Sequence, residues 1–317
     1  MNRPNVAVLL ATYNGEKYLF EQIDSLINQN EVDVDVYIHD DFSNDSTNDV
    51  IKKLLSEHPD NINLLPSQKK LGVVATYQFL LDRVESDYYF FCDQDDVWYA
   101  DKIIDELEIL YNSKTVPSMV YSDLEVVDSN LNVITASMFK HMKVNHTEEI
   151  NKLIVQNVIT GNTVGFNRQL RDIVVNDFRM DDDRILMHDG WLGLVASVFG
   201  ELTFLNQPTV KYRQHANNVV GAKKGRLRKL LDIDKLRMAI VKSTQQAYVF
   251  YQKSNNTSLL SLKNEKKDVI YSYATLFEQP KMARIKILMS NKLYKQGLFR
   301  NVVFFYLVIT QKKVKNA

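Results

Sequence analysis

Residues 90–98, Phe-Phe-Cys-Asp-Gln-Asp-Asp-Val-Trp, bring a hydrophobic run to an end at three carboxylates within four positions. The run that leads to them, residues 87–92, is aromatic and short, which is typical of a buried strand. Helical spacing of apolar residues resumes at residues 101–110. The three acids are therefore predicted to lie at the carboxyl end of a strand, where open α/β sheets bind their ligands.

These clustered carboxylates, Asp93, Asp95 and Asp96, should raise one another's pKa unless a cation neutralises them. Carboxylate oxygens suit Mg²⁺ or Mn²⁺, and Mg²⁺ commonly binds through one or two carboxylates together with substrate phosphates. The motif alone also fits a solvated acidic loop, or acids that stabilise the start of the helix that follows. The rest of the chain decides between these interpretations.

The composition is that of a folded, cysteine-poor protein. The chain has 317 residues, 45% of them hydrophobic, which is enough for one large domain or for one domain and an appendage. Its one cysteine, Cys92, excludes an internal disulfide framework and indicates a reducing compartment. The first apolar run, residues 6–10, is shorter than a membrane span or the core of a signal peptide. We therefore expect a cytoplasmic protein.

The formal net charge of zero conceals two parts of opposite sign. Residues 211–317 contain 23 Lys and Arg against 5 Asp and Glu, which leaves 16 against 34 for residues 1–210. A basic tail of this kind can bind nucleic acid, anionic lipid or the acidic body of its own chain. Charge alone leaves these three partners open.

Strands and helices alternate through the first hundred residues. Apolar patterns predict strands at residues 6–10, 32–38, 62–65 and 88–92, and helices around residues 19–27, 50–55 and 72–84. Such alternation implies βαβ units and a parallel sheet with right-handed crossovers. The loops at Thr12, Asp41 and Asp95 then open on one edge and converge on one crevice. Since the first turn lacks a glycine-rich phosphate loop, we expect a metal ion to hold phosphate.

The second part of the chain is less regular and contains one further polar group of interest. Strands are predicted at residues 118–123, 160–166, 202–205 and 210–213, and helices begin at Asn167 and near Asp189. Asp189 and Trp191 at a helix start fit two interpretations. They are either a cap with a core aromatic, or a catalytic base beside a ring that stacks on a sugar.

Five motifs in order give the chain its resemblance to a known family. They are Ala11–Gly15, Asp40–Asp45, Asp93–Asp96, His188–Trp191 and Tyr212–His215. The chain resembles the family 2 glycosyltransferases with the A-type nucleotide-sugar fold, and it looks most like their bacterial rhamnosyltransferase branch. The resemblance covers roughly residues 5–220. It implies an α/β fold with a mostly parallel central sheet, flanking helices and a Rossmann-like nucleotide site.

The resemblance implies a donor site at the ends of the first strands. Tyr13 would pack on the pyrimidine, and Asp41 would accept a hydrogen bond from the base N3. Asp95, with Asp93 nearby, would hold a divalent ion, Mg²⁺ or Mn²⁺, that bridges the two phosphates. The remaining donor and metal residues are Ala11 and Thr12 beside the base, Arg213 as a clamp on pyrophosphate, and His215 as a further metal ligand. Arg213 and His215 also fit the alternative that they are simply exposed side chains at the end of a strand.

The resemblance also implies a catalytic residue. Asp189 would act as general base on the acceptor hydroxyl, whose oxygen attacks the anomeric carbon from the face opposite the leaving nucleoside diphosphate. The product would be inverted, with no covalent intermediate. Trp191 would either wall a sugar ring or pack its helix into the core, and Gly161 and Asn162 are expected to border the acceptor site.

The predicted protein is thus an inverting, metal-dependent glycosyltransferase at residues 1–220, followed by a basic, amphipathic helical region at residues 221–317. The expected donor is dTDP-rhamnose, with a UDP-hexose as the alternative, and the expected acceptor is a lipid-linked saccharide in cell-surface polysaccharide synthesis. The Gln-x-x-Arg-Trp motif and membrane spans of processive members are missing, which indicates one sugar per catalytic event. A sugar-phosphate nucleotidyltransferase is disfavoured, because it should open with a Gly-rich loop. An inactive carbohydrate-binding or assembly module is the non-enzyme alternative.

The basic tail combines Lys and Arg with apolar and aromatic residues. Helical stretches are predicted up to residue 250, over 259–277 and over 281–310, and the longest apolar run, residues 302–309, is too short for a membrane span. This pattern favours an interfacial helix on anionic lipid, so we expect the enzyme at the inner face of the cell membrane. The alternative is a helical appendage packed on the acidic body. Nucleic-acid binding is not expected, because the basic residues alternate with Leu, Val and Phe.

Overall fold

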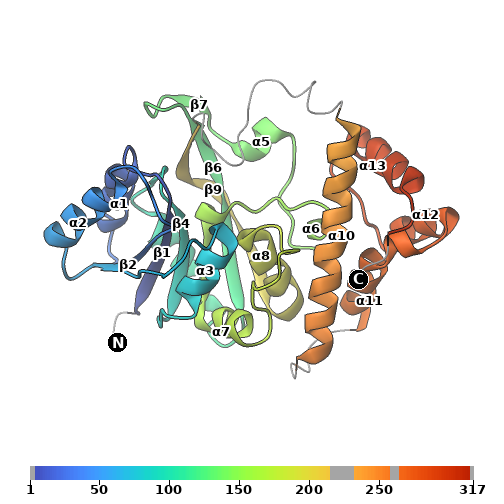
Figure 1. Cartoon of the computed structure of the whole chain (residues 1–317), viewed down its shortest axis with the longest axis horizontal. Helices are drawn as coiled ribbons and strands as arrows, with labels where there is room; N and C mark the ends of the chain where they lie inside the picture. Colours follow the sequence, from blue (N-terminus) through green and yellow to red (C-terminus); the bar gives the residue numbers. More distant parts are fainter. Residues whose placement is uncertain (1–3, 215–231, 258–263, 315–317) are drawn as a thin grey trace.

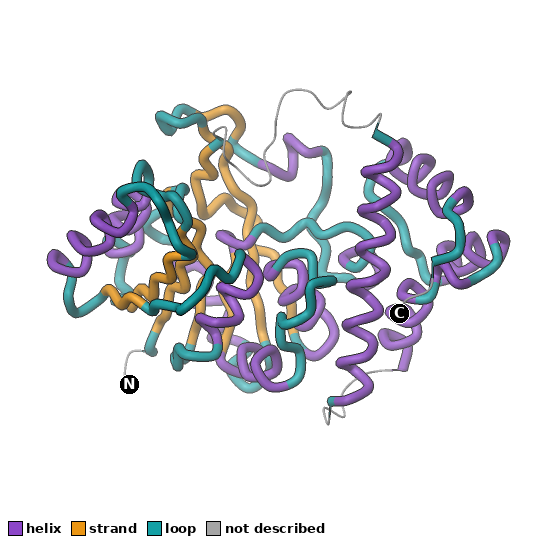
Figure 2. Tube along the Cα trace, viewed as in Figure 1, coloured by secondary structure: helices purple, strands orange, loops and turns teal. Residues whose placement is uncertain are grey.

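In the part of the chain that the structure describes, nine strands join into one mixed sheet in the order β3-β2-β1-β4-β8-β6-β9-β5, with β7 paired to β6 (Figures 1 and 2). The computed structural model describes residues 4–214, 232–257 and 264–314. The strands are β1 (Val6–Thr12), β2 (Asp35–Asp40), β3 (Ile62–Leu64), β4 (Tyr88–Asp93), β5 (Val97–Trp98), β6 (Ser118–Val127), β7 (Val133–Thr135), β8 (Val164–Asn167) and β9 (Glu201–Arg213).

Helices cover both faces of this sheet (Figure 1). Those of the first two thirds of the chain are α1 (Leu19–Ile27), α2 (Thr47–Glu57), α3 (Val73–Leu81), α4 (Lys102–Asn112), α5 (Met138–Met142), α6 (Ile150–Leu153), the 3₁₀ turn η1 (Gly161–Thr163), α7 (Arg168–Asn176) and α8 (His188–Phe199). The apolar sides of α1, α2 and α4 pack on one face, and those of α3, α7 and α8 pack on the other.

The strand β1 shows why its sequence is a continuous apolar run. Ala7 and Leu9 belong to the core under α3, α7 and α8, whereas Val6, Val8 and Leu10 belong to the core under α1, α2 and α4. A strand whose two faces are both buried has no solvent side on which polar residues could alternate. The run of five apolar residues therefore marks the centre of a two-sided α/β sheet.

The strands β1, β2 and β4 run parallel, as predicted. Ala11 on β1 pairs with His39 on β2 and with Asp93 on β4, so the carboxyl ends of the three strands lie at one edge. Beyond β4 the sheet is mixed, because β8 is antiparallel to both β4 and β6. The two strands predicted at 202–205 and 210–213 are one strand, β9, whose register on β6 shifts around Asp123.

The C-terminal helices pack on the side of α8 that faces away from the sheet (Figure 1). They are α10 (Ile233–Asn256), α11 (Asn264–Ala274), the 3₁₀ turn η2 (Leu276–Glu278), α12 (Lys281–Ser290) and α13 (Leu298–Thr310). The ring of Phe250 on α10 lies 4.9 Å from that of Phe178 and 5.3 Å from that of Trp191, so this region shares the core of the sheet. The predicted division at residue 220 falls outside the described residues.

The segment predicted as one helical stretch at 281–310 is two helices. Gly297, with φ of 89°, stands directly before α13. This φ lies in the left-handed region that favours glycine, so the chain turns here between α12 and α13. Among the helices that the structure describes, none combines the length and the apolar content that crossing a membrane requires.

Candidate active site

Gln94 joins the loop after β1 to the loop after β4. Thr12 Oγ1 donates to Gln94 Oε1 at 2.6 Å, and the Tyr13 amide donates to the same oxygen at 2.8 Å. Gln94 Nε2 returns a hydrogen bond to the Tyr13 carbonyl at 3.0 Å. A Cβ at Gly15 would clash with Gln94 and would lie 2.7 Å from Thr12 Oγ1. Close packing of the two loops thus explains the glycine in this turn.

The loop after β2 meets the same edge. The Asp41 amide donates to the Thr12 carbonyl at 2.8 Å, and the Gly15 amide donates to Thr47 Oγ1 at 2.8 Å. The three loops predicted to converge are therefore bonded to one another. Parallel pairing of β1, β2 and β4 is the physical cause, since it places all three strand ends together.

Asp41 and Tyr13, the residues expected at the nucleotide base, differ in exposure. Asp41 is buried, and its carboxylate oxygens accept the amides of Leu71 at 2.5 Å and Gly72 at 2.9 Å. Tyr13 is exposed, and the Lys70 ammonium lies 3.3 Å from the centroid of its ring. A base that stacked on this face of Tyr13 would take the place of Lys70.

Asp93 ends β4 and lies among other carboxyl groups. Burial, and then the charges of Asp95 and Asp189, raise the pKa of Asp93 to about 7. Tyr77 Oη donates to Asp93 Oδ1 at 3.4 Å. A cation beside these groups would favour the ionised carboxylate and lower this pKa again.

The donor set at this edge suits a hard divalent cation. Asp93 and Asp95 provide carboxylate oxygens, and two carboxylates with substrate phosphates are a common way to hold Mg²⁺. Within the described ranges, no three His, Cys, Asp or Glu side chains gather around a shared point. The two residues present thus fit the predicted ion only in company with a phosphate ligand. His215, predicted as a further ligand, lies outside the described residues.

Asp189 lies in the first turn of α8 and is buried. Its carboxylate accepts hydrogen bonds from the Gly190 amide at 2.5 Å, from Asn157 Nδ2 at 3.3 Å and from the Gly161 amide. Burial nevertheless raises the pKa of Asp189 to about 6. A carboxylate whose pKa lies near the working pH is suited to accept a proton as a general base.

His188 and Tyr77 connect the two acidic residues by ring contacts. The Tyr77 ring, whose hydroxyl bonds Asp93, stacks on His188 with centroids 3.9 Å apart. Both nitrogens of His188 are buried without a hydrogen-bond partner in the part of the chain that the structure describes, and burial lowers its pKa to about 3. His188 is therefore neutral, and it packs against Gly161, where a Cβ would lie 2.6 Å from its Nε2.

Arg213 has a different place from the one predicted. Its side chain is 2% exposed, and its guanidinium donates to the Asp95 carbonyl at 2.9 Å, to the Ser129 carbonyl at 2.8 Å and to Glu21 at 2.5 Å. A guanidinium buried among these acceptors does not clamp a pyrophosphate. We therefore correct its role from donor binding to support of the loop that carries Asp95.

Asn162 and Asp96 form a buried pair behind this loop. Asn162 Nδ2 donates to Asp96, which also accepts the Arg213 amide at 2.8 Å. Burial, and then the charges of Asp95 and Asp93, raise the pKa of Asp96 well above its ordinary value. The Asn162 side chain is fully buried, so of the two residues expected at the acceptor only Gly161 touches Asp189.

Trp191 is a core residue. It is fully buried, its Nε1 donates to the Phe178 carbonyl at 2.6 Å, and its ring packs against Phe178 and Phe250. The interpretation of Trp191 as a wall for a sugar ring is therefore wrong. The alternative, that it packs its helix into the core, describes its surroundings.

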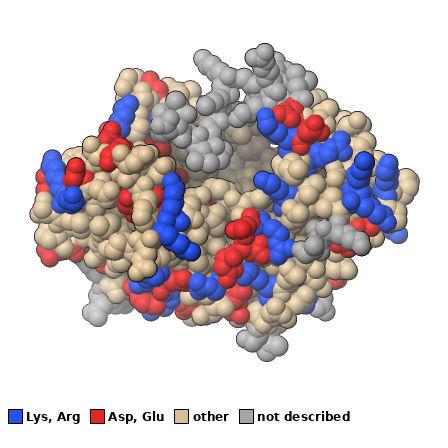
Figure 3. Space-filling view, in the orientation of Figure 1, with Lys and Arg blue, Asp and Glu red and all other residues tan. Residues whose placement is uncertain are grey.

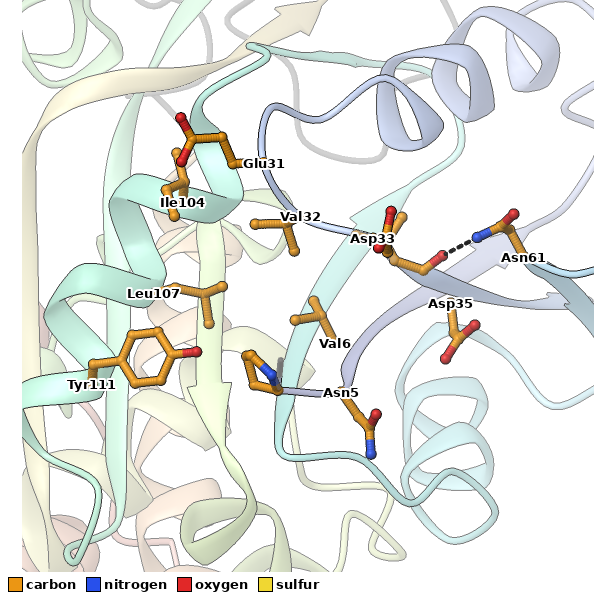
Figure 4. Close-up of a pocket in the computed structure, with 12 residues that line it drawn as sticks. Asn5, Val6, Glu31, Val32, Asp33, Asp35, Asn61, Ile104, Leu107 and Tyr111 are labelled. Carbon is orange, nitrogen blue, oxygen red and sulfur yellow. Dashed lines mark hydrogen bonds between the residues drawn. The ribbon is translucent and has the colours of Figure 1, made fainter. Parts of the chain in front are cut away.

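A cavity of about 280 Å³ lies at the opposite edge of the sheet (Figure 4). It is lined by the starts of β1 and β2, with Val6 and Asp35, and by Leu107 and Tyr111 of α4. None of the predicted site residues lines it. The candidate active site is thus the group of loops at the carboxyl edge rather than this cavity.

Sequence reasoning missed several residues at the candidate site. Gln94 lies within the Asp93–Asp96 motif but was given no role there, and Tyr77 and Asn157 lie outside every motif; each gains its place through contacts between distant segments. Gln94 had one available signal, its position between two candidate ligands. Nothing in the sequence indicated Tyr77 or Asn157.

Solved structures with a similar fold show which class of protein this chain resembles. The solved structure of S. aureus TarS residues 1–349 in complex with UDP-GlcNAc aligns with a TM-score of 0.58 at 16% identity, covering 90% of this chain and 73% of that one. The mannosyltransferase PcManGT from Pyrobaculum calidifontis, in complex with GDP-Man and Mn²⁺, aligns with a TM-score of 0.55 at 16% identity, covering 96% and 79%. The chain thus has the A-type glycosyltransferase fold, as predicted.

The family follows from sequence comparison. The model of glycosyl transferase family 2 matches residues 7–172, which span β1 to α7, and the chain belongs to this family. The dTDP-rhamnosyl transferase RfbG of Shigella flexneri is 30% identical over 224 residues, 67% of this chain and 74% of the relative. The glucosyltransferase WfgD of Escherichia coli, a UDP-Glc:alpha-D-GlcNAc-diphosphoundecaprenol beta-1,3-glucosyltransferase, is 26% identical over 125 residues, 39% and 47%.

Proposed function

We propose that this family 2 glycosyltransferase transfers rhamnose from dTDP-rhamnose to a lipid-linked saccharide during cell-surface polysaccharide synthesis. Support for the donor comes from the relative named as a dTDP-rhamnosyl transferase, which is similar over two thirds of the chain. Support for the acceptor comes from the relative whose name contains a diphosphoundecaprenol-linked sugar. A UDP-hexose donor is the alternative, and it is favoured by the neighbour in complex with UDP-GlcNAc.

The proposal rests on one observation: the buried carboxylate of Asp189 lies near the acidic residues at the end of β4. The charge of Asp189 contributes to the raised pKa of Asp93, so the two groups lie within electrostatic reach of each other. One carboxylate can then serve the acceptor while the other serves the donor phosphates.

In the proposed reaction the acceptor hydroxyl gives its proton to Asp189. Its oxygen forms a bond to the anomeric carbon as the bond from that carbon to the diphosphate oxygen breaks. The nucleoside diphosphate leaves with the electron pair, and attack from the opposite face inverts the anomeric centre. Asn157 and the Gly161 amide hold the Asp189 carboxylate in place for this proton transfer.

Donor binding is assigned to the loops at the carboxyl edge. Ala11, Thr12 and Tyr13 would contact the base, and Asp41 is placed on the neighbouring strand end by its bonds to the start of α3. Asp93 and Asp95 would hold Mg²⁺ or Mn²⁺, which when bound supplies positive charge to the donor diphosphate.

A second part of the proposal places the enzyme at an anionic membrane surface. The four most exposed large apolar side chains in the described residues are Leu298, Met282, Phe299 and Val302, at 83%, 78%, 64% and 60%. All four lie on α12 or α13, and the three on α13 follow helical spacing on one side. We call the three on α13, Leu298, Phe299 and Val302, the apolar face.

Basic residues flank the apolar face in the sequence, although one of them, Arg284, is buried. Residues 281–314 contain eight Lys and Arg and no Asp or Glu. Figure 3 shows Lys and Arg side chains over the C-terminal helices, at the right of the view. Exposed apolar residues flanked by basic ones are what an interfacial helix on anionic lipid requires. The proposed function of the basic tail is thus to bind the enzyme to the inner face of the cell membrane.

The test of the transfer reaction is product analysis with the full chain. Purified enzyme is incubated with Mg²⁺, a lipid-linked saccharide fraction and either dTDP-rhamnose or UDP-glucose, and products are identified by mass spectrometry. Transfer of rhamnose that is lost in Asp189→Asn supports the proposal. Transfer of glucose alone establishes the alternative donor, and no transfer with any donor supports an inactive module.

The test of membrane binding is flotation with vesicles. The full chain should float with anionic vesicles and remain unbound with neutral ones. Leu298→Ser combined with Phe299→Ser should abolish flotation. Val133→Ser combined with Ile134→Ser is the matched control, because these exposed apolar residues lie on β7, away from the tail. Equal flotation of both double variants would exclude the apolar face as the membrane contact.

A further inference from the structure

A second pocket lies beside the candidate active site, at the same edge of the sheet. We call it the α5 pocket; its volume is about 450 Å³, and Asp123, Lys140, Lys143, His146 and Phe204 are among its lining residues. None of its lining residues has a role in the site described above, so the kind of ligand that it suits is inferred from those residues.

Sheet register places the α5 pocket near Asp93. In β8, Phe166 pairs with Tyr89 of β4 and also with Met119 of β6. Four residues further along each strand stand Asp93 and Asp123, which are therefore level with each other. Two strand spacings separate them, a distance of about 10 Å. The pocket thus opens beside the strand ends assigned to the donor.

The pocket lies on the α8 side of the sheet. Phe139 and Phe204, which line it, pack against the same core that includes Trp191 of α8. The charge of Asp189 acts on Asp93, which is level with Asp123 of the pocket, so the α5 pocket and the base lie near the same strand end.

The free charge of the pocket is positive. Among the described residues its one lining acid is Asp123, which accepts the Leu124 amide at 2.8 Å, the Met138 amide at 3.1 Å and the Ser137 hydroxyl, so that it caps α5. Lys140 and Lys143 make no ion pair with any described residue. The pocket therefore presents two ammonium groups without a carboxylate to match them.

One wall of the pocket is aromatic and fixed. The rings of His146 and Phe204 stack with centroids 4.2 Å apart at 10°, and Phe139 lies against Phe204 at 5.2 Å. His146 Nδ1 also lies 3.3 Å from Glu148. Asn145 and Asn206 add amide groups to the lining. Ammonium, amide and aromatic groups together suit a sugar that carries phosphate.

The rim of the pocket is built onto the start of α13. Arg300 donates to the carbonyls of Met142 at 2.7 Å and Lys143 at 3.1 Å. Gln296 Nε2 donates to the Asn145 carbonyl at 2.7 Å. Figure 1 shows α5 between the sheet and the C-terminal helices. The rim thus connects α13, which carries the apolar face, to the sheet edge where the candidate active site lies.

We propose that the α5 pocket binds the phosphate or diphosphate group of the acceptor through Lys140 and Lys143. The inference rests on the proposed function and names the chemistry of the acceptor at that same site. The phosphate can belong to a lipid carrier or to a soluble sugar phosphate, and the experiment separates these sources.

The test is calorimetric binding to the full chain with dTDP and Mg²⁺ already saturating the donor site. The probes are decyl diphosphate, which represents the lipid carrier, and inorganic diphosphate, which represents a soluble source. The variants are Lys140→Gln with Lys143→Gln, and as matched control Lys52→Gln with Lys53→Gln, two exposed lysines on α2. Failure of dTDP to bind at the outset would count against the proposed function alone.

We expect diphosphate binding that weakens at least tenfold in the pocket variant and remains unchanged in the control. Tighter binding of decyl diphosphate than of inorganic diphosphate would assign a lipid source, and equal binding would assign a soluble one. Equal affinity of the two double variants, or no binding of either probe to enzyme loaded with dTDP, would overturn the proposal.

Discussion

Asp189→Asn should make the protein more stable while it removes turnover. Burial raises the pKa of Asp189 from its ordinary 3.8 to about 6. A difference of about 2 pKa units means that the ionised side chain destabilises the folded state by about 3 kcal/mol. An amide carries no charge, yet its oxygen still accepts from Asn157 and Gly190.

The sign of the pH dependence follows from the direction of this shift. The folded state holds the proton of Asp189 more tightly than the unfolded state does. The penalty is therefore complete above about pH 6, declines as pH falls, and vanishes below about pH 4, where both states are protonated. The gain from Asp189→Asn should approach about 3 kcal/mol at pH 7.5 as an upper limit, and it should fall to about 1 kcal/mol at pH 4.5.

Urea unfolding at the two pH values measures the effect, and initial rates measure the loss of turnover, expected at about 10²–10⁴-fold. Asp182→Asn is the control of opposite sign, because hydrogen bonds from Arg184 lower the pKa of Asp182. That variant should lose stability at pH 7.5. If Asp189→Asn were less stable than the natural chain at pH 7.5, or its gain were the same at both pH values, burial would not destabilise the ionised form of Asp189 as inferred here.

Three further predictions concern the same site and the core beneath it. The value of kcat/KM should fall about tenfold per pH unit below pH 6, because protonation of Asp189 removes the base; a flat profile from pH 5 to 8 would place the base elsewhere. Gly161→Ala should lower turnover at least tenfold and leave dTDP binding by calorimetry unchanged, since the added Cβ would lie 2.6 Å from His188 Nε2; unchanged turnover would separate His188 from the site. Lys102→Met should cost about 3–5 kcal/mol in thermal or urea unfolding, because it leaves Glu106 buried without its partner, and adding Glu106→Gln should recover part of the loss.

The sheet could be predicted because its signals are local. The run at residues 6–10 and the aromatic run before Asp93 are each long enough to identify a buried strand, and alternation with helices implies parallel pairing. Parallel pairing then brings Thr12, Asp41 and Asp95 to one edge, as the structure shows.

The errors arose where a side chain's partners are distant in sequence. Trp191 follows Asp189 by two residues, but helical geometry turns its ring toward Phe250 of α10, which no local pattern reveals. Arg213 stands at a strand end, yet the loop that carries Asp95 folds over it. Two strands were predicted at 202–205 and 210–213, where the structure has one continuous strand, β9, with a shifted register on β6.

The most direct test of the central claim is calorimetric titration of the purified full chain with dTDP, UDP and GDP, each with and without Mg²⁺ or Mn²⁺. We expect that dTDP or UDP binds, that the divalent ion strengthens the binding, and that Asp95→Asn removes most of this dependence on the ion. If none of the three nucleotides bound under any of these conditions, the strand-end loops would not be a nucleotide-sugar site, and the catalytic role proposed for Asp189 would fail with them.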